Sequence, residues 1–398
     1  MKRIDIIKEK MSIERFNLTD VVFLIIIFSL ISIAITTFIF RRNKIYQATN
    51  SIESVYNEIL SNYYEDVNKE ELASSAIEGM MDYLNEKYST YMGEDATHSL
   101  NETLDGTYKG IGVVVQKNDK GLFIYNIFKN SPADNAGLQV NDQIVSLDDI
   151  RITNDSNLND VVKYIREHDS IAFGIKRNES DLLINVNTAD IDDPVVSTKL
   201  LSNKDTNYGY IRLAVFSKTS ATQFKNSLEE LEKNDIKGLI IDLRSNTGGY
   251  VEQAGEIVKM FTNKNKVIYS FKEKNNTEVF KDDDDTERNY PIVILVNSGT
   301  ASAAELLSLS LKEAYGAILV GTTTYGKGRI QGTANITDNR KIKLTTGKWY
   351  SPNNNNIDGV GIVPSYVVEL PNEFFKNPVD KNDSQLTKGL GVLVELNK

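Results

Sequence analysis

The sequence contains no cysteine, which excludes cysteine nucleophiles, thiolate metal sites and disulfide bonds. Histidine is nearly absent as well, because only His98 and His168 occur, far apart in the sequence and in polar surroundings. We interpret both as surface residues. Acid–base chemistry in this protein is therefore expected to depend on Lys, Asp or Glu side chains. Neither a metal ion nor another cofactor is expected.

An excess of positive charge is also missing, because 45 Lys and Arg residues stand against 55 Asp and Glu residues, for a formal net charge of -10. Such a balance offers no broad surface that would neutralise a phosphate backbone, so nucleic acid is not expected as a partner. Hydrophobic residues make up 40% and charged residues 25%, which is typical of globular proteins. A length of 398 residues predicts two or three domains rather than one.

Charge is wholly absent from residues 21–40, VVFLIIIFSLISIAITTFIF. A helix of this length spans about 30 Å, the thickness of the hydrocarbon core of a bilayer, so the stretch predicts a transmembrane helix. It runs directly into Arg41 and Arg42 without the small-residue exit of a cleaved signal peptide, which favours an uncleaved anchor. More basic residues precede the span than follow it, so residues 1–20 are expected to be a cytoplasmic tail and the remainder to lie outside the cell membrane.

Residues 44–92 carry apolar side chains at helical spacing, with a break near Asp66, Val67 and Asn68. This pattern predicts two or more amphipathic helices in an N-terminal helical region, which we place at residues 43–100. The apolar stripes of these helices leave two alternatives open. They form a homodimer surface, or they pack on the next domain of the same chain.

A small α+β module is predicted at residues 102–190, where short β runs surround one helical stretch from Leu158 to Arg166. The segment SPADNAGLQVNDQIVSLDD resembles the S-P-A, A-G-L and G-D-x-I pattern of PDZ domains, with Asn141 where Gly is usual. Asn is tolerated there because it also accepts a positive φ. The resemblance implies a peptide-binding loop, in which backbone N–H groups capture a terminal carboxylate while the peptide adds a β-strand. This loop comprises Gly110, Ile111, Gly112 and Val113. The alternative is that its glycines belong to an ordinary turn.

From residue 191 to residue 378 the pattern alternates between apolar β runs and helical stretches. Apolar runs between helices predict an α/β core with a largely buried sheet. Four adjacent aspartates at residues 282–285 are interpreted as a solvated loop rather than a metal site. Residues 379–398 are expected to form a C-terminal tail.

Residues 291–331 predict a strand, a tight turn, a helix, a second strand and a loop. Ser302 stands where the helix begins, beside unpaired backbone N–H groups at the positive end of the helix dipole, where an oxyanion can be held. The alternative is structural, because the run from Ser302 to Glu305 reads S-x-x-E, a capping box in which Ser302 only caps the helix.

Lys327 lies between Gly326 and Gly328, at the mouth of the apolar strand AILVG. A lysine that is partly desolvated in such a place has a lowered pKa, so that its neutral amine can accept a proton. By itself the G-K-G pattern is typical of a turn. A further segment, GLIIDLRSNTGG, ends a buried strand in Gly248 and Gly249, which frees backbone N–H groups at an edge where open sheets bind ligands. A phosphate loop is the alternative, but the spacing G-x-x-x-x-G-K-[ST] is missing.

Together the segments GLIIDLRSNTGG, GTASAAE and YGKG resemble the carboxyl-terminal processing (tail-specific) serine peptidases, S41-type, over about residues 50–398. The resemblance implies an α/β fold, with a crotonase/ClpP-like β-α core into which a PDZ domain is inserted. It also implies a set of site residues: Ser302 as nucleophile, Lys327 as general base, Gln331 orienting the lysine, Gly248 and the amide of Ala303 as the oxyanion hole, and Arg166 coupling peptide binding to activation.

The activity implied is that of a membrane-anchored serine endopeptidase, which cleaves protein substrates recognised through their C-terminal region. A regulatory protein partner is compatible with this class, because a peptide-sensing domain permits an inactive resting state. A non-catalytic PDZ scaffold is the runner-up, and an acyl-CoA enzyme on the related core is less favoured. One geometric requirement follows from the assignment: Lys327 and Gln331 would stand about 13 Å apart in a straight strand, so the backbone must bend between them.

Overall fold

The computed structural model describes residues 18–42, 44–285, 288–337 and 339–398. The chain divides after Glu86 into two compact units, which are described separately. The basic residues that precede the apolar span, on which the expected orientation rests, lie outside the described residues.

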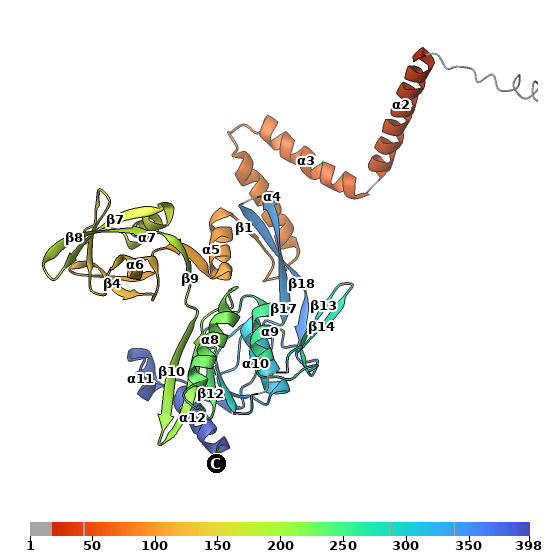
Figure 1. Ribbon diagram of the computed structural model, residues 1–398. Helices are drawn as coiled ribbons and strands as arrows, with labels where there is room; N and C mark the ends of the chain where they lie inside the picture. Colours follow the sequence, from red (N-terminus) through yellow and green to blue (C-terminus); the bar gives the residue numbers. More distant parts are fainter. Residues whose placement is uncertain (1–17, 43, 286–287, 338) are drawn as a thin grey trace, which may run out of the picture. The chain divides into compact units, whose positions relative to one another are not determined.

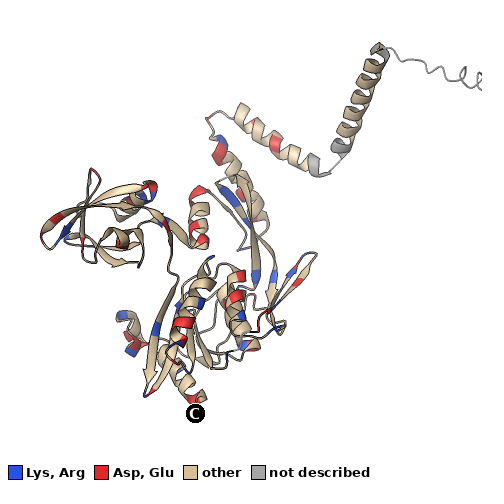
Figure 2. Ribbon diagram, in the orientation of Figure 1, with Lys and Arg blue, Asp and Glu red and all other residues tan. Residues whose placement is uncertain are grey.

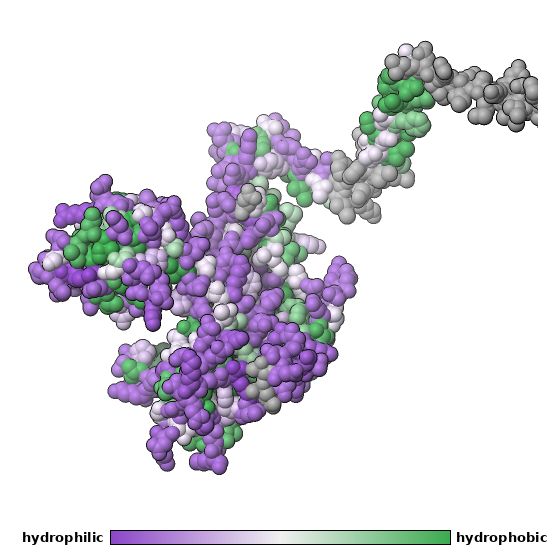
Figure 3. Space-filling view, in the orientation of Figure 1, coloured by the Kyte–Doolittle hydropathy of each residue, from purple (hydrophilic) through white to green (hydrophobic). Residues whose placement is uncertain are grey.

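The first unit consists of helices. They are α2 (Leu18–Arg42), α3 (Lys44–Asn62) and α4 (Lys69–Tyr83). Within α2, the stretch Val21–Phe38 is long and apolar enough to cross a membrane. It carries no charged residue in Figure 2 and is hydrophobic in Figure 3. The predicted break between the next two helices coincides with a helix cap, because the side chain of Asn68 accepts hydrogen bonds from the N–H groups of Glu70 and Glu71.

The second unit contains the PDZ-like module (Figure 1). Its six-stranded sheet has the order β3-β4-β5-β7-β8, and β6 pairs with β5. The strands are β3 (Val113–Asn118), β4 (Gly121–Ile127), β5 (Gln143–Leu147), β6 (Ile150–Arg151), β7 (Ser170–Arg177) and β8 (Ser180–Asn187), and the helices are α6 (Pro132–Ala136) and α7 (Leu158–Glu167). Helix α7 buries Val161 and Ile165 in the core of the module. Asn141 has a φ of 74°, as its place in the pattern predicts.

The chain enters and leaves this module through two neighbouring strands. Strands β2 (Thr107–Gly110) and β9 (Ala189–Asp192) pair antiparallel, with Tyr108 opposite Ile191. Because entry and exit lie side by side, the module is an insertion that leaves the remaining α/β portion of the unit continuous.

The central sheet of the α/β portion has the order β10-β11-β12-β15-β16-β19. Its strands are β10 (Val196–Asn203), β11 (Thr206–Leu213), β12 (Leu239–Asp242), β15 (Ile292–Val296), β16 (Ile318–Gly321) and β19 (Tyr366–Val367). All are parallel except β10, which pairs antiparallel with β11. The helices of this portion are α8 (Ser220–Glu232), α9 (Val251–Lys259), α10 (Ala303–Ala314), α11 (Asn372–Lys376), the 3₁₀ helix η1 (Asp380–Asn382) and α12 (Ser384–Leu396).

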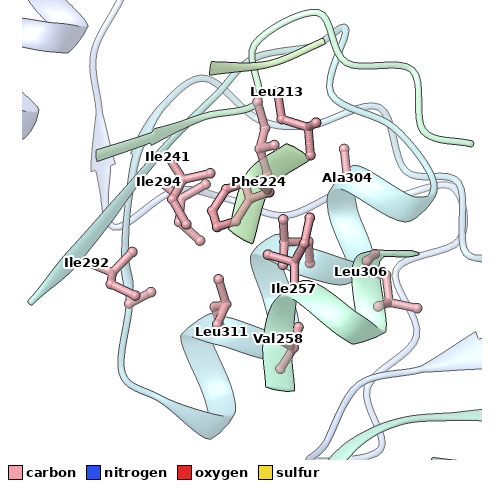
Figure 4. Packing of buried hydrophobic residues seen from close by; sticks show 14 of the residues in the cluster. Leu213, Phe224, Ile241, Ile257, Val258, Ile292, Ile294, Ala304, Leu306 and Leu311 are labelled. Carbon is pink, nitrogen blue, oxygen red and sulfur yellow. The ribbon is translucent and has the colours of Figure 1, made fainter. Parts of the chain in front are cut away.

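The inner strands of the central sheet are buried on both faces, which explains why β15 is apolar at every position and β12 is apolar from Leu239 to Ile241. Along β12, Leu239 and Ile241 face one hydrophobic cluster and Ile240 faces another. The first cluster is filled by α8, α9 and α10, and Figure 4 shows Phe224 of α8 close to Ile241 and Ile294 of the sheet. The second is filled by α12. Residues that were expected to form a C-terminal tail therefore include a packed core helix.

A second sheet has the order β1-β18-β13-β14, and β17 pairs with β18. Its strands are β1 (Thr90–Met92), β13 (Val267–Glu273), β14 (Thr277–Lys281), β17 (Arg329–Thr337) and β18 (Arg340–Tyr350), and helix α5 (Glu94–Asp105) contacts β18. The aspartates at 282–285, expected to be a solvated loop, begin with the buried Asp282, which accepts a hydrogen bond of 2.5 Å from the Thr262 hydroxyl. Asp282 is thus a structural acceptor, which differs from the expectation.

Candidate active site

Ser302 occupies the turn between β15 and α10, as the N-cap residue of the helix. Its φ of 57° and ψ of -118° are rarely adopted by a residue with a side chain, and such a conformation costs about 1–3 kcal/mol. The turn is held in place from the neighbouring loop: the Thr300 hydroxyl donates to the Leu243 carbonyl at 2.8 Å, and the Ala301 N–H donates to the Asn246 carbonyl at 2.9 Å. The sequence therefore places a strained serine at a rigid strand–turn–helix junction.

Gly248 brings its backbone against this turn. It has a φ of 102°, and a Cβ atom at this position would lie 2.8 Å from Ser302 Cβ and 3.1 Å from the nitrogen of Ala303. Glycine is needed here because any side chain would collide with the serine turn. The N–H of Gly248 donates to Asn246 Oδ1 at 2.9 Å, within its own loop.

Lys327 lies in the loop between β16 and β17, and its backbone is fixed on both sides. Its N–H donates to Glu305 Oε2 at 2.8 Å, and its carbonyl accepts a hydrogen bond of 2.9 Å from Nε1 of the buried Trp349. Its ammonium group lies 5.3 Å from the centroid of the Tyr88 ring.

The two glycines that flank Lys327 are required by close packing. A Cβ at Gly326 would lie 2.8 Å from the nitrogen of Gly361, and a Cβ at Gly328 would lie 2.6 Å from the nitrogen of Asp358. The G-K-G pattern is therefore a loop pressed against another backbone segment, as its glycines suggest.

A single pocket of ≈ 390 Å³ contains four of the five residues proposed for catalysis. Ser302, Lys327, Gln331 and Gly248 line it, and Ala303 is buried directly after Ser302. The other lining residues come from α5, from the loops beside Val215 and Tyr250, and from β17 and β18: Leu100, Asn101, Thr103, Leu104, Val215, Thr247, Gly249, Tyr250, Val251, Arg329, Ile330, Thr333, Lys341 and Lys343. Residues distant in sequence are thus brought to one cavity.

Gln331 reaches this pocket because strand β17 is irregular. Its pairing with β18 shifts register between Ile330 and Gln331, and Lys327 itself precedes the strand. A register shift of this kind bends a strand locally, which agrees with the bend that the assignment requires. The side-chain nitrogen Nε2 of Gln331 is buried and has no hydrogen-bond partner among the described residues.

The charged groups that line the pocket are basic. Arg329 pairs with Asp358 at 2.7 Å, and Lys341 donates to Asn101 Oδ1 at 2.7 Å. No acidic side chain lines the pocket among residues 18–42, 44–285, 288–337 and 339–398. Strand β18, which carries Lys341 and Lys343, is accordingly marked by blue segments in Figure 2.

The peptide-binding residues predicted for the PDZ-like module also lie together. Gly110, Ile111, Gly112, Val113 and Arg166 line a pocket of ≈ 50 Å³ between the loop before β3 and helix α7. The position of the loop at the end of a strand is that expected for capture of a terminal carboxylate.

Arg166 connects this pocket to helix α5. Its Nη1 atom lies 2.7 Å from Glu102 of α5, and its guanidinium group lies 5.5 Å from the centroid of the Tyr108 ring. Its Nε atom is buried without a partner in the described part of the chain. Leu100 and Leu104 of the same helix line the Ser302 pocket, so α5 lines that pocket and is joined to the other through Arg166.

Sequence reasoning missed the contacts that fix the backbone of the site. Glu305 was considered only as half of a capping box, and neither Trp349 nor Tyr88 was singled out for a role beside Lys327. Pairings across such separations in sequence leave no local pattern, although Trp349 is the only tryptophan of the chain. Neither histidine lines the pocket, and no group of His, Asp or Glu with metal-binding geometry occurs among the described residues.

The comparisons with known proteins agree on one family of peptidases. Residues 207–368 match the model of peptidase family S41, residues 110–188 match the PDZ domain, and residues 39–96 match the N-terminal domain of the activating protease CtpB. The carboxy-terminal processing protease CtpB of Bacillus subtilis (strain 168) is 35% identical over 338 residues, which cover 84% of this chain and 70% of that protein. Carboxy-terminal processing protease CtpA of the same organism is 33% identical over 382 residues, covering 92% and 80%.

A solved structure also resembles the fold. A protein of Bacteroides fragilis NCTC 9343 described as an S41 protease aligns with a TM-score of 0.50, at 16% identity, over 84% of this chain and 92% of that chain. At this identity the likeness concerns the fold alone.

Proposed function

Because the chain belongs to the carboxy-terminal processing serine peptidases of family S41, with a PDZ domain, we propose that it cleaves proteins by means of Ser302 and Lys327. The observation that carries this proposal is the shared pocket, in which Ser302, Lys327, Gln331 and Gly248 meet from separate segments of the chain. The strained backbone of Ser302 supports it further, because such strain is concentrated at functional sites.

In the proposed reaction the neutral amine of Lys327 takes the hydroxyl proton of Ser302 while Oγ attacks the peptide carbonyl carbon. The tetrahedral intermediate collapses, the C–N bond breaks, and the lysine passes the proton to the leaving amine. The acyl-enzyme ester is then hydrolysed by a water molecule that Lys327 deprotonates in the same manner. Gln331, whose Nε2 atom is free to donate among the described residues, is proposed to orient the lysine.

The oxyanion hole is proposed to consist of the N–H groups of Gly248 and Ala303. The close approach of Gly248 to the serine turn supports its place in the hole. Its N–H now donates to Asn246, so stabilising an oxyanion requires this hydrogen bond to be shared or exchanged.

Substrate recognition is proposed to occur through the C-terminal region of the substrate, bound by Gly110–Val113 of the PDZ domain, with Arg166 coupling this binding to the active site. The contact from Arg166 to α5, whose residues line the Ser302 pocket, provides a physical route for that coupling. We also propose that the protein has a regulatory protein partner and that its N-terminal helices form a homodimer.

The proposed location and membrane topology are those that the sequence predicts. We propose that α2 anchors the chain in the cell membrane, with its N-terminus in the cytoplasm and its catalytic portion outside, and that the central sheet and its helices form a crotonase/ClpP-like core. The proposed divisions are the cytoplasmic tail (1–20), the transmembrane helix (21–40), the helical region (43–100), the PDZ domain (102–190), the peptidase core (191–378) and the C-terminal segment (379–398). A non-catalytic scaffold is not favoured.

The proposal is tested by cleavage of an unfolded protein that ends in an apolar C-terminus. The full chain, in detergent micelles, is compared with its Ser302→Ala and Lys327→Ala variants. Wild type is expected to cleave, and both variants are expected to lose about 1000-fold or more of the rate. The wild-type rate should rise with pH as the lysine loses its proton. Equal cleavage by all three proteins would show that the reaction needs neither Ser302 nor Lys327.

A further inference from the structure

Glu305 is a buried carboxylate that the proposed reaction does not use. Its side chain is inaccessible to solvent, and it lies one helical turn after the serine turn. On the proposed function of Ser302 and Lys327, we infer that Glu305 is the positioning residue that fixes the distance between nucleophile and base by binding both of their backbones.

A single oxygen of Glu305 accepts hydrogen bonds from both residues. The N–H of Ser302 donates to Oε2 at 2.9 Å, and the N–H of Lys327 donates to the same atom at 2.8 Å. The two backbone nitrogens cannot separate further than these two bonds together allow. The carboxylate therefore sets the spacing between the turn before α10 and the loop before β17.

The other oxygen holds the rest of the lysine loop. Oε1 accepts from the Thr324 hydroxyl at 2.5 Å and from the Gly326 N–H at 2.7 Å. The orientation of the Thr324 hydroxyl is fixed, because its oxygen accepts the Ile362 N–H at 2.7 Å and its proton is left for Glu305. Both sides of the lysine loop are thus attached to one side chain of α10.

A capping role accounts for only part of this arrangement. A capping glutamate needs to accept the N–H of its N-cap residue, here Ser302, and nothing more. Glu305 accepts three additional hydrogen bonds, and all three donors belong to the segment from Thr324 to Lys327. The box that the sequence predicts is therefore extended to the second half of the proposed dyad.

The four hydrogen-bond donors around Glu305 fit a carboxylate side chain and do not fit the amide side chain of glutamine. A carboxylate offers about four acceptor positions on two oxygens and no donor. In a Glu305→Gln variant one oxygen becomes an NH₂ group, which would face either the N–H groups of Ser302 and Lys327 or the hydroxyl of Thr324 and the N–H of Gly326. Donor then meets donor, although the size of the side chain is unchanged, and the loop must move.

The test measures kcat and KM of full-length Glu305→Gln with the same substrate. A displacement of about 1 Å at a catalytic group costs on the order of 100-fold in rate, so kcat is expected to fall about 100-fold while KM changes less than about 3-fold. The matched control is Glu313→Gln on the same helix, where the carboxylate accepts from Asn353 and Asn355 and does not line the pocket. This control should keep the wild-type kcat.

Folding is monitored separately with the fluorescence of Trp349, the only tryptophan, whose indole binds the Lys327 carbonyl. Rates are expressed per folded molecule, so a role in stability alone would leave kcat unchanged. If Glu305→Gln does not fold, the pair Thr324→Val and Thr324→Ser decides instead. The valine removes the hydroxyl and should lower kcat about 10-fold, and the serine should restore most of the rate.

Two results would overturn the inference: a folded Glu305→Gln with the kcat of wild type, or a folded Thr324→Val with the kcat of wild type where the glutamine variant does not fold. Failure of the proposed function looks different, because Ser302→Ala would then remain active as well. If Ser302→Ala is inactive while Glu305→Gln is fully active, only the inference about Glu305 is overturned.

Discussion

At the scale of single residues, the site depends on backbone positions that tolerate almost no change. Ser302 adopts a φ of 57°, and Gly248 approaches its Cβ so closely that no side chain fits between them. Both features follow from the same requirement, which is to bring two turns from different strands into direct contact. The serine hydroxyl is presented where those turns meet.

Gly248→Ala is therefore expected to lose activity. The new methyl group would lie 2.8 Å from Ser302 Cβ and 2.9 Å from the Ala301 carbonyl oxygen, so the serine turn must shift, and kcat should fall by about 100-fold. The matched control is Gly316→Ala, which has a φ of 91° with open space around it. It carries only the backbone cost of about 1–2 kcal/mol and should keep its kcat when folded. Full activity of Gly248→Ala would contradict the tight contact.

Sequence was sufficient to nominate Ser302 and Lys327 as candidates, because each has a distinctive local setting between small residues. It was not sufficient to find what holds them. Trp349 donates to the Lys327 carbonyl from a neighbouring strand, and three of the four donors to Glu305 come from the loop that follows β16. Such partners are chosen by the packing of the fold, and spacing along the chain carries no record of them.

At the scale of elements, helices and strands were predicted well where their periodicity is strong. The predicted helix from Leu158 to Arg166 is observed as α7, and the strand, helix and strand predicted within residues 291–331 are observed as β15, α10 and β16. Helix α12 was not predicted, because residues 379–398 were expected to form a C-terminal tail. The apolar side chains of α12 are explained by their packing on the second face of the central sheet, for which no covering helix was predicted.

The end of α8 contacts the segment before strand β15 through a charged cluster. Arg288 lies 2.6 Å from Glu232, and the Tyr290 hydroxyl donates to the same carboxylate at 2.6 Å. Burial by itself would raise the pKa of Glu232, but these hydrogen bonds and the charge of Arg288 outweigh it and lower the pKa below its usual value of 4.5.

The stabilising effect of this cluster is expected to depend on pH. Because the pKa of Glu232 is lower in the folded state, the stabilisation is complete above pH 4.5 and is lost as the pH falls through the folded-state value. Glu232→Gln should lower the unfolding free energy by about 1–3 kcal/mol at pH 7 and by less at pH 3. Thermal unfolding at both values measures this, with the exposed Glu229→Gln as control. An equal difference at both pH values would argue against the assignment.

At the scale of the whole molecule, the chain combines an apolar helix, an inserted PDZ module and a peptidase fold. The family and the order of these parts could be predicted from sequence, because each carries its own motif. The insertion, which the family resemblance implied, is seen directly in the pairing of β2 with β9, which brings the two ends of the module together.

The expected orientation in the membrane can be tested directly, because the chain has no cysteine and an introduced one is unique. Ser54→Cys, exposed on α3, should react with a membrane-impermeant maleimide in intact cells that express the full chain. Ser12→Cys, in the predicted cytoplasmic tail, should react only after lysis. The reverse pattern would invert the topology, and reaction of both residues in intact cells would exclude the span.

The packing of α12 has a consequence for biosynthesis. Strands β12 and β15 leave the ribosome well before residues 384–396, yet their face with Ile240 and Val293 is covered by Leu393 of that helix. The PDZ module, complete by residue 188, can fold first as a unit. A chain still being translated is therefore expected to hold a folded PDZ module while the sheet is still uncovered, and the peptidase fold is completed only after synthesis has passed α12.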